Sequence, residues 1–245
     1  MKAELNNVKA LIFDYGGTLD TRGRHWAHVL WEAFTKNNVP VTEEQFREAY
    51  VHAERTLGKN PIIQPDDDFR ALLQKKVNIE IQRLVELNYW TPTEEERIAK
   101  TTAIAQYCYD YARTTVQESK ATLCQLREVY PMVLVSNFYG NIETILTDFG
   151  IRHLFDHIIE SAVVGIRKPN PGIFMLGVKA TGKKTDETVV IGDSYDKDIE
   201  PARSIGCRTV WLKGEGWTKE ENTDTQAADC IIEQLSDLLR TLREA

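Results

Sequence analysis

Long hydrophobic segments are missing from this sequence of 245 residues. A membrane-spanning helix needs about 20 consecutive apolar residues, and no run in the sequence approaches that length, so we expect no membrane partner. The N-terminal segment MKAELNN carries an acid and amides where a secretory signal would be apolar. We therefore predict a cytoplasmic protein.

Closely spaced cysteines are also missing. The sequence contains no CxxC pair of the kind that binds zinc or performs redox chemistry. Free cysteine is among the most buried residue types, and intracellular proteins keep their thiols reduced. We therefore interpret all four as buried, reduced thiols: Cys108, Cys124, Cys207 and Cys230.

Positive charge is scarce, because 37 acidic residues face 30 lysines and arginines and the formal net charge is −7. A nucleic-acid-binding protein needs a basic face for the phosphate backbone, so we predict no nucleic-acid partner. A small anionic substrate needs only one local cationic pocket. The composition, 42% apolar and 27% charged, is typical of a globular protein.

What the sequence does contain is a series of short apolar runs, rich in valine and isoleucine and bounded by turn residues. Runs that do not alternate with polar residues are typical of parallel strands buried on both faces. Amphipathic helical patterns separate the runs, and this alternation predicts a doubly wound α/β core. The predicted strands are residues 8–13, 132–135, 157–164, 188–191, 209–212 and 230–232.

The first two predicted strands are too far apart for one crossover connection. The intervening residues show no strand pattern but four amphipathic helical stripes. Thr42 and Gln45 form a capping box for the second helix, which we expect to stop at Gly58, and Thr91 is the expected cap of the fourth. We therefore predict an α-helical cap domain, residues 19–115, inserted into a core formed by residues 1–18 and 116–245.

Polar residues follow four of the predicted strands. In an open parallel sheet, ligands bind outside the carboxyl ends of the strands. Carboxylates gathered at such an edge raise one another's pKa unless a cation lies among them, and Mg²⁺ prefers oxygen ligands. We therefore expect a Mg²⁺ site here. The polar residues are Asp14 after the first strand, Ser136 and Asn137 after the second, Lys168 after the third, and Asp193 and Asp198 after the fourth.

Four fragments carry these residues in order: FDYGGTL, VLVSN, GIRKPNP and IGDSYDKD. Together they resemble the haloacid dehalogenase (HAD) superfamily, in its members with an inserted helical cap of the subfamily I type. The resemblance covers nearly the whole chain. It implies a Rossmann-like parallel sheet with a helical cap, and a Mg²⁺-dependent phosphatase that acts on a small phosphorylated metabolite.

The resemblance also implies roles for individual residues. Asp14 would be the nucleophile that forms an aspartyl-phosphate, and Lys168 would assist it while holding phosphoryl oxygens. Asp198 would orient Asp193 or Lys168. The implied phosphate-binding residues are Gly17, Thr18, Ser136, Asn137 and Lys168, and the implied metal ligands are Asp14, Asp193 and the carbonyl of Gly16.

Gly16 is a departure from the pattern, because most phosphatases of this superfamily have an aspartate there that serves as general acid and base. Glycine keeps the carbonyl but cannot move a proton, and losing such a group costs about a hundred- to ten-thousandfold in rate. Asp20 and His25 are the nearest candidate substitutes along the chain. Arg22 and Arg24 are candidate contacts of the cap with the substrate.

The missing acid leaves other functions open. One alternative is a catalytically weak binder of a phosphate ligand. Another is a phosphonate hydrolase of the same superfamily, which would need a cap lysine that forms a Schiff base; no pattern distinguishes Lys36, Lys59, Lys75 or Lys76. The metal-free dehalogenases fit less well, because their chemistry does not need Asp193 and Asp198. The sequence indicates neither the substrate nor the oligomeric state.

Overall fold

The computed structural model describes residues 5, 7–217 and 225–242. In this part of the chain, six parallel strands form one sheet in the order β3-β2-β1-β4-β5-β6. This Rossmann-type order confirms the predicted fold class, and it places the topological switch point beside β1. The strands are β1 (Ala10–Phe13), β2 (Met132–Ser136), β3 (His157–Glu160), β4 (Thr188–Gly192), β5 (Arg208–Leu212) and β6 (Cys230–Ile232).

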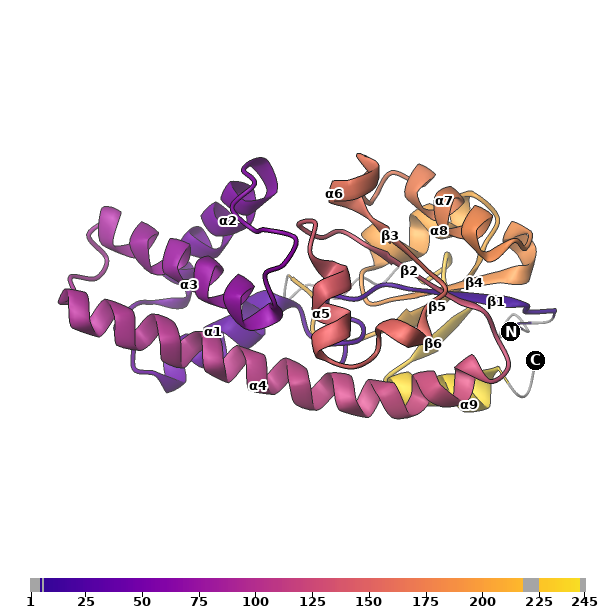
Figure 1. Cartoon of the computed structure of the whole chain (residues 1–245), viewed down its shortest axis with the longest axis horizontal. Helices are drawn as coiled ribbons and strands as arrows, with labels where there is room; N and C mark the ends of the chain where they lie inside the picture. The colour runs from indigo at the N-terminus through magenta and orange to yellow at the C-terminus, as the bar shows by residue number, and fades with distance from the viewer. Residues whose placement is uncertain (1–4, 6, 218–224, 243–245) are drawn as a thin grey trace.

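Helices cover both faces of the sheet, which is why its central strands are apolar throughout (Figure 1). On one face, α7 (Gly172–Thr181) and α8 (Glu200–Ser204) enclose a cluster that includes Ile12. Leu11 and Phe13 point to the opposite face, where α5 (Ile142–Asp148), α9 (Leu238–Thr241) and the second half of α4 (Glu94–Arg127) lie.

The helices between β1 and β2 gather at one end of the molecule, on the left of Figure 1. They are α1 (Trp26–Lys36), α2 (Glu43–Lys59), α3 (Phe69–Glu86) and the first half of α4. α4 is one continuous helix of 34 residues, so the predicted boundary between residues 115 and 116 falls inside it. The division into residues 19–115 and the rest stays a prediction.

The N-cap residue was predicted correctly for α2 but not for α4. Thr42 and Gln45 form the expected capping box, but α2 continues through Gly58 to Lys59. The fourth helix begins two residues later than predicted, because Thr93 rather than Thr91 is its cap. The Thr93 hydroxyl accepts the N–H of Glu96, whose carboxylate accepts the N–H of Thr93, so two backbone donors are satisfied together.

The strand predicted at 157–164 is too long. β3 ends at Glu160, whose carboxylate accepts the N–H of Gly140 at 2.5 Å, and residues 161–164 form the short helix α6 (Ser161–Val164). Val163 in that helix is 72% exposed, so the apolar run does not continue into the sheet. The prediction of four buried thiols is also wrong at one position, because Cys124 lies on an exposed part of α4.

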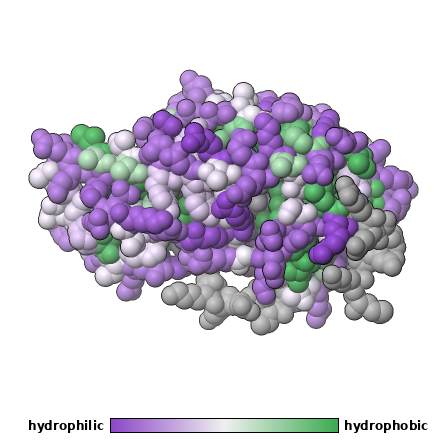
Figure 2. Space-filling view, turned by 90° about the horizontal axis from the view of Figure 1, so that it is seen from below, coloured by the Kyte–Doolittle hydropathy of each residue, from purple (hydrophilic) through white to green (hydrophobic). Residues whose placement is uncertain are grey.

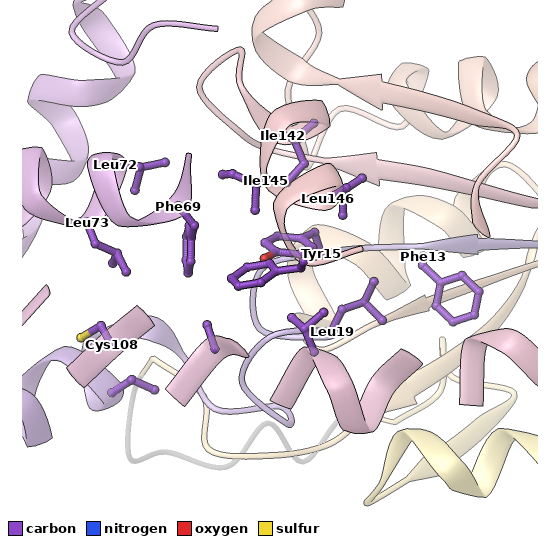
Figure 3. Packing of buried hydrophobic residues seen from close by; sticks show 14 of the residues in the cluster. Phe13, Tyr15, Leu19, Phe69, Leu72, Leu73, Cys108, Ile142, Ile145 and Leu146 are labelled. Carbon is purple, nitrogen blue, oxygen red and sulfur yellow. The ribbon is translucent and has the colours of Figure 1, made fainter. Parts of the chain in front are cut away.

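A single hydrophobic cluster joins the sheet to the inserted helices (Figure 3). From Phe13 on β1, the cluster passes through Tyr15, just beyond the strand end, to Phe69 at the start of α3. The rings of Tyr15 and Phe69 meet edge to face, with centroids 6.5 Å apart. The inserted helices are therefore packed against the end of the sheet where β1 delivers Asp14.

The surface on the side where α4 runs is mostly hydrophilic, with scattered apolar patches (Figure 2). Although α4 is long, it carries charged residues throughout. Within residues 5, 7–217 and 225–242, no helix combines the length and the hydrophobicity that a membrane crossing requires.

Candidate active site

The side chains predicted at the strand ends converge on one cavity, of about 170 Å³, between the sheet edge and the inserted helices. The position agrees with the ligand site expected at the switch point of an open α/β sheet. Of the predicted residues, those that line the cavity are Asp14, Gly16, Gly17, His25, Ser136, Asn137, Lys168, Asp193 and Asp198.

Lys168 links two carboxylates at the centre of the site. Its ammonium group donates a 2.6 Å hydrogen bond to Oδ1 of Asp14 and another of 2.6 Å to Oδ1 of Asp198. Burial alone would lower the pKa of Lys168, but the two negative charges together raise it above its ordinary value. The lysine is therefore a permanent cation beside Asp14.

Asp14, Asp193 and Asp198 offer carboxylate oxygens that all lie within 4.8 Å of one another. Burial, and then the charges of Asp14 and Asp198, raise the pKa of Asp193. Burial also raises the pKa of Asp198 to about 6, although Lys168 opposes the shift. A purely oxygen donor set with unrelieved repulsion fits a hard divalent cation such as Mg²⁺.

Asp193 is held by two donors and by a close approach of the backbone. The Thr18 hydroxyl donates to its carboxylate at 2.9 Å, and the Trp211 indole donates to its carbonyl at 2.8 Å. Gly17 has a φ of +97°, and a Cβ there would lie 2.4 Å from both carboxylate oxygens of Asp193, so only glycine fits. Thr18, predicted to bind phosphate, is not among the cavity-lining residues; its hydroxyl supports Asp193.

Asn137 fixes the position of Lys168 through a reciprocal pair of hydrogen bonds. The amide nitrogen of Asn137 donates to the Lys168 carbonyl at 3.1 Å, and the Lys168 N–H donates to the amide oxygen at 2.9 Å. The end of β2 and the loop between α6 and α7 are thereby joined. Ser136, only 1% exposed, precedes this joint and borders the cavity.

The two candidate substitutes for the missing acid occupy different environments. Asp20 is fully buried and lies outside the cavity-lining set; its two oxygens accept the Gly17 N–H at 2.7 Å and the Trp26 indole N–H at 2.9 Å. His25 does line the cavity. Burial, with the nearby charges of Lys197 and Lys76, lowers its pKa to about 3, so the ring is neutral at neutral pH.

Arg22 and Arg24 are not brought to the cavity. The Arg22 guanidinium makes two 2.7 Å hydrogen bonds to Glu118 on α4. Arg24 pairs with Glu32 and Glu215, each at 3.0 Å. Both arginines tie neighbouring elements together.

The cavity wall opposite the sheet contains functional groups that the sequence patterns did not identify. Glu54 on α2 and Lys76 on α3 line it and form an ion pair. A signal for Lys76 was present in the sequence, because it falls on the buried face of α3, between Leu73 and Val77. A charged residue inside an apolar stripe is unusual, and it indicates a polar environment that the helix alone does not explain.

This site and fold define a hydrolase of the HAD type. A family model described as haloacid dehalogenase-like hydrolase matches residues 8–206, and the chain belongs to this family. A phosphoglycolate phosphatase from Photorhabdus laumondii is 26% identical over 240 residues, which cover 97% of this chain and 94% of that protein.

A second relative, a glyceraldehyde 3-phosphate phosphatase from Methanopyrus kandleri, is 36% identical over 100 residues. The match covers 40% of this chain and 43% of that protein, so it spans less than half of the relative's length. A crystal structure of the HAD hydrolase YfnB from Bacillus subtilis, bound to magnesium, superposes with a TM-score of 0.60 at 18% identity, over 97% of this chain and 99% of that one. At this identity the likeness concerns the fold.

Proposed function

We propose that the protein is a Mg²⁺-dependent phosphatase that acts on a small phosphorylated metabolite through an aspartyl-phosphate on Asp14. The observation that carries the proposal is the buried contact of Lys168 with Asp14 and Asp198, beside Asp193, in a cavity large enough for a small ligand. The phosphatase names of the relatives support the same reaction class.

Different residues around the cavity would bind the metal ion and the phosphoryl group. Asp14, Asp193 and the Gly16 carbonyl would hold Mg²⁺, which supplies charge neutralisation to the phosphoryl oxygens when bound. Lys168 and Ser136 would hold other phosphoryl oxygens. Asn137 would keep the Lys168 backbone in place, through the two hydrogen bonds described above.

Asp14 is suited to attack phosphorus. Lys168 contacts only Oδ1 of Asp14, so Oδ2 is available as the nucleophile. Attack forms the Asp14–phosphorus bond while the bond from phosphorus to the leaving-group oxygen breaks. The leaving group departs as an oxyanion that takes a proton from solvent. Water then attacks the phosphoryl group, the bond between Asp14 and phosphorus breaks, and inorganic phosphate leaves while the Asp14 carboxylate is restored.

Neither candidate substitute supplies the missing proton. Asp20 uses both oxygens in accepting hydrogen bonds within its loop, and His25 is neutral, with Nδ1 already accepting the Ala27 N–H at 3.2 Å. We therefore expect substrates whose leaving group needs little protonation to react faster. Aryl, acyl and anomeric sugar phosphates have this property.

The phosphonate-hydrolase alternative is less well supported. A Schiff base requires an uncharged lysine. Lys76 is the candidate that lines the cavity, but its ion pair with Glu54 raises its pKa in spite of burial. Lys36 and Lys75 pair with Glu32 and Asp67.

A panel of phosphorylated metabolites, assayed with Mg²⁺ and with EDTA, tests the proposal. We expect Mg²⁺-dependent release of phosphate, abolished in Asp14→Asn, which removes the nucleophilic charge with almost no change of shape. Asp186→Asn is the matched control, because Asp186 is exposed before the amino end of β4. Release that persists in Asp14→Asn would contradict the mechanism, and release by neither protein would favour the phosphate binder.

A further inference from the structure

Two cap helices and one core loop build a polar cluster into the cavity wall. The Lys76 ammonium on α3 contacts Oε1 of Glu54 on α2, and the Tyr139 hydroxyl, from the loop after β2, donates to Oε2 of the same carboxylate at 3.0 Å. All three residues line the cavity together with Asp14 and Lys168. The cluster is therefore shared between the helices and the sheet edge.

Stability does not explain this cluster. Lys76 is only 5% exposed, although the Glu54 side chain is 30% exposed. Taking a charge such as the Lys76 ammonium out of water costs about as much as its ion pair gains, so well-packed apolar residues often do as well or better. The surrounding wall is largely apolar, with Trp26, Phe69 and Leu73 among its residues. An ion pair with a buried ammonium and a partly exposed carboxylate, facing a reaction site in such a wall, indicates a role toward the ligand.

The cluster is ionised but carries no net charge. Burial opposes ionisation of both groups, yet the pKa of Glu54 is lowered and that of Lys76 is raised by their mutual attraction. Nearby Glu80 is fully buried without a hydrogen-bond partner among the described residues. Burial raises its pKa to about 8, so it is mostly protonated at pH 7 and adds little charge.

The pair keeps some hydrogen-bonding capacity for a ligand. Of the three N–H bonds of Lys76, one is used by Glu54, and the ammonium lies 4.7 Å from the centroid of the Tyr50 ring. Each oxygen of Glu54 accepts one hydrogen bond and has a further lone pair. The pair can thus both donate and accept at the wall that faces the phosphate position.

We propose that Lys76 and Glu54, supported by Tyr139, form the leaving-group subsite and select a neutral, hydroxylated leaving group, as in a polyol or sugar phosphate. Hydroxyl groups donate and accept without adding charge to the buried pair. A carboxylate there would leave a net negative charge in a low-dielectric wall. The inference deepens the proposed function and rests on it, because the phosphate is placed at Lys168.

Cationic side chains lie elsewhere around the cavity and do not contradict this selection. Arg167 and Lys197 line it, are exposed, and make no ion pair among the residues that the structure describes. Their positive charges would attract a phosphate dianion from solvent. Arg167 lies on the loop after α6 and Lys197 in the helical turn Tyr195–Ile199 after β4, whereas the Lys76–Glu54 pair lies on the cap.

Three substrates of similar size separate the effect of hydroxyl groups in the leaving group from the effect of a carboxylate. Glycerol 3-phosphate has hydroxyl groups, propyl phosphate has none, and 3-phosphoglycerate replaces one hydroxymethyl group with a carboxylate. We expect kcat/KM for glycerol 3-phosphate to exceed that for each of the others at least tenfold. A preference for 3-phosphoglycerate would overturn the assignment of a neutral leaving group.

The residues are tested by the ratio of kcat/KM for glycerol 3-phosphate to that for propyl phosphate. Hydrogen bonds to charged groups predict a fall of roughly ten- to hundredfold in this ratio for Lys76→Met, for Glu54→Gln and for the double variant. Lys75→Met is the matched control on the same helix, because Lys75 pairs with Asp67 and does not line the cavity. An unchanged ratio in folded variants would overturn the proposal.

Two further measurements test the subsite if the charge variants do not fold or if the protein does not turn over these substrates. Tyr139→Phe removes only the hydroxyl that holds Glu54, and we expect a several-fold fall in the ratio even if the charge variants do not fold.

In the Asp14→Asn background, calorimetry with the intact substrates reports binding without turnover. Weakened binding of glycerol 3-phosphate in Lys76→Met, with no turnover by the parent protein, would support the subsite and reject the phosphatase. Turnover by the parent protein, with the affinity and the ratio unchanged in Lys76→Met, would support the phosphatase and reject the subsite.

Discussion

At the scale of single residues, two adjacent glycines have opposite requirements. Gly17 is confined by its positive φ and by the carboxylate of Asp193, whereas no atom lies within 4 Å of the Cβ that a residue 16 side chain would add, and Gly16 has no positive φ. Steric exclusion therefore does not account for the missing acid at position 16. An aspartate side chain would therefore have room at position 16.

Gly16→Asp tests this directly. We expect turnover of simple alkyl phosphates to rise about tenfold or more, because a general acid is worth roughly a hundred- to ten-thousandfold when well placed. Turnover of aryl phosphates should change little, since their leaving groups need no proton. The measurement is kcat for both substrate types. Equal effects on the two would show that proton transfer does not limit the reaction.

The residues at the strand ends could be named from the sequence because parallel strands bring their carboxyl ends together whatever the loops do. Asp14, Ser136 and Asp193 belong to this group, whereas Lys168 lies beyond α6 rather than at the end of β3, and it was named from the fragment GIRKPNP. Glu54 and Tyr139 could not be named from the sequence, because their contact depends on how α2 is positioned relative to the loop after β2. Local patterns carry no information about that placement. The role of Thr18 could not be predicted for the same reason, because it depends on the distance from its hydroxyl to the Asp193 carboxylate.

At the scale of elements, the loop between β1 and α1 is braced from within. Asp20 joins the N–H of Gly17 to the indole of Trp26 in the first turn of α1, so one buried carboxylate holds both ends of the loop. Its pKa is raised to about 7, chiefly by burial. The geometry favours a positioning role over proton transfer to a substrate.

Asp20→Asn separates these two roles. The amide can accept only one of the two N–H groups, and leaving a buried donor unsatisfied costs about 1–3 kcal/mol. We expect a lower Tm and an equal loss of activity toward alkyl and aryl phosphates. A selective loss toward alkyl phosphates at unchanged Tm would identify Asp20 as the substitute acid. Thermal unfolding and paired kinetics measure both outcomes.

Element boundaries were the least predictable part of the fold. The apolar run of β3 continues in the sequence through Val164, but strand pairing stops at Glu160, whose carboxylate accepts the N–H of Gly140. That contact joins the end of β3 to the loop before α5, and no local pattern indicates it. α4 could not be predicted as one helix, since its first half packs against α3 and its second half lies beside the sheet. Each half shows its own apolar stripe.

At the scale of the whole molecule, folding buries acids both at the sheet edge and on the inserted helix α3. Burial is the first cause of the raised pKa of Asp193, of Asp198 at about 6, and of Glu80 at about 8. Such groups bind more protons in the folded state than in the unfolded one between about pH 4 and pH 8. These acids therefore make stability fall as the pH rises through this window, whereas His25, whose pKa is lowered to about 3, acts in the opposite direction up to about pH 6.5.

Without Mg²⁺, we expect Tm to be higher at pH 5 than at pH 8, because each unit of raised pKa corresponds to about 1.4 kcal/mol. Mg²⁺ should raise Tm at pH 8, where its carboxylate ligands are ionised, and have less effect at pH 5. Glu80→Gln, nearly isosteric and remote from the metal ligands, should flatten the slope without changing the response to Mg²⁺. The measurement is thermal unfolding across pH with EDTA or Mg²⁺. A Tm that rises from pH 5 to pH 8 in EDTA would show that these acids are not buried as protonated groups.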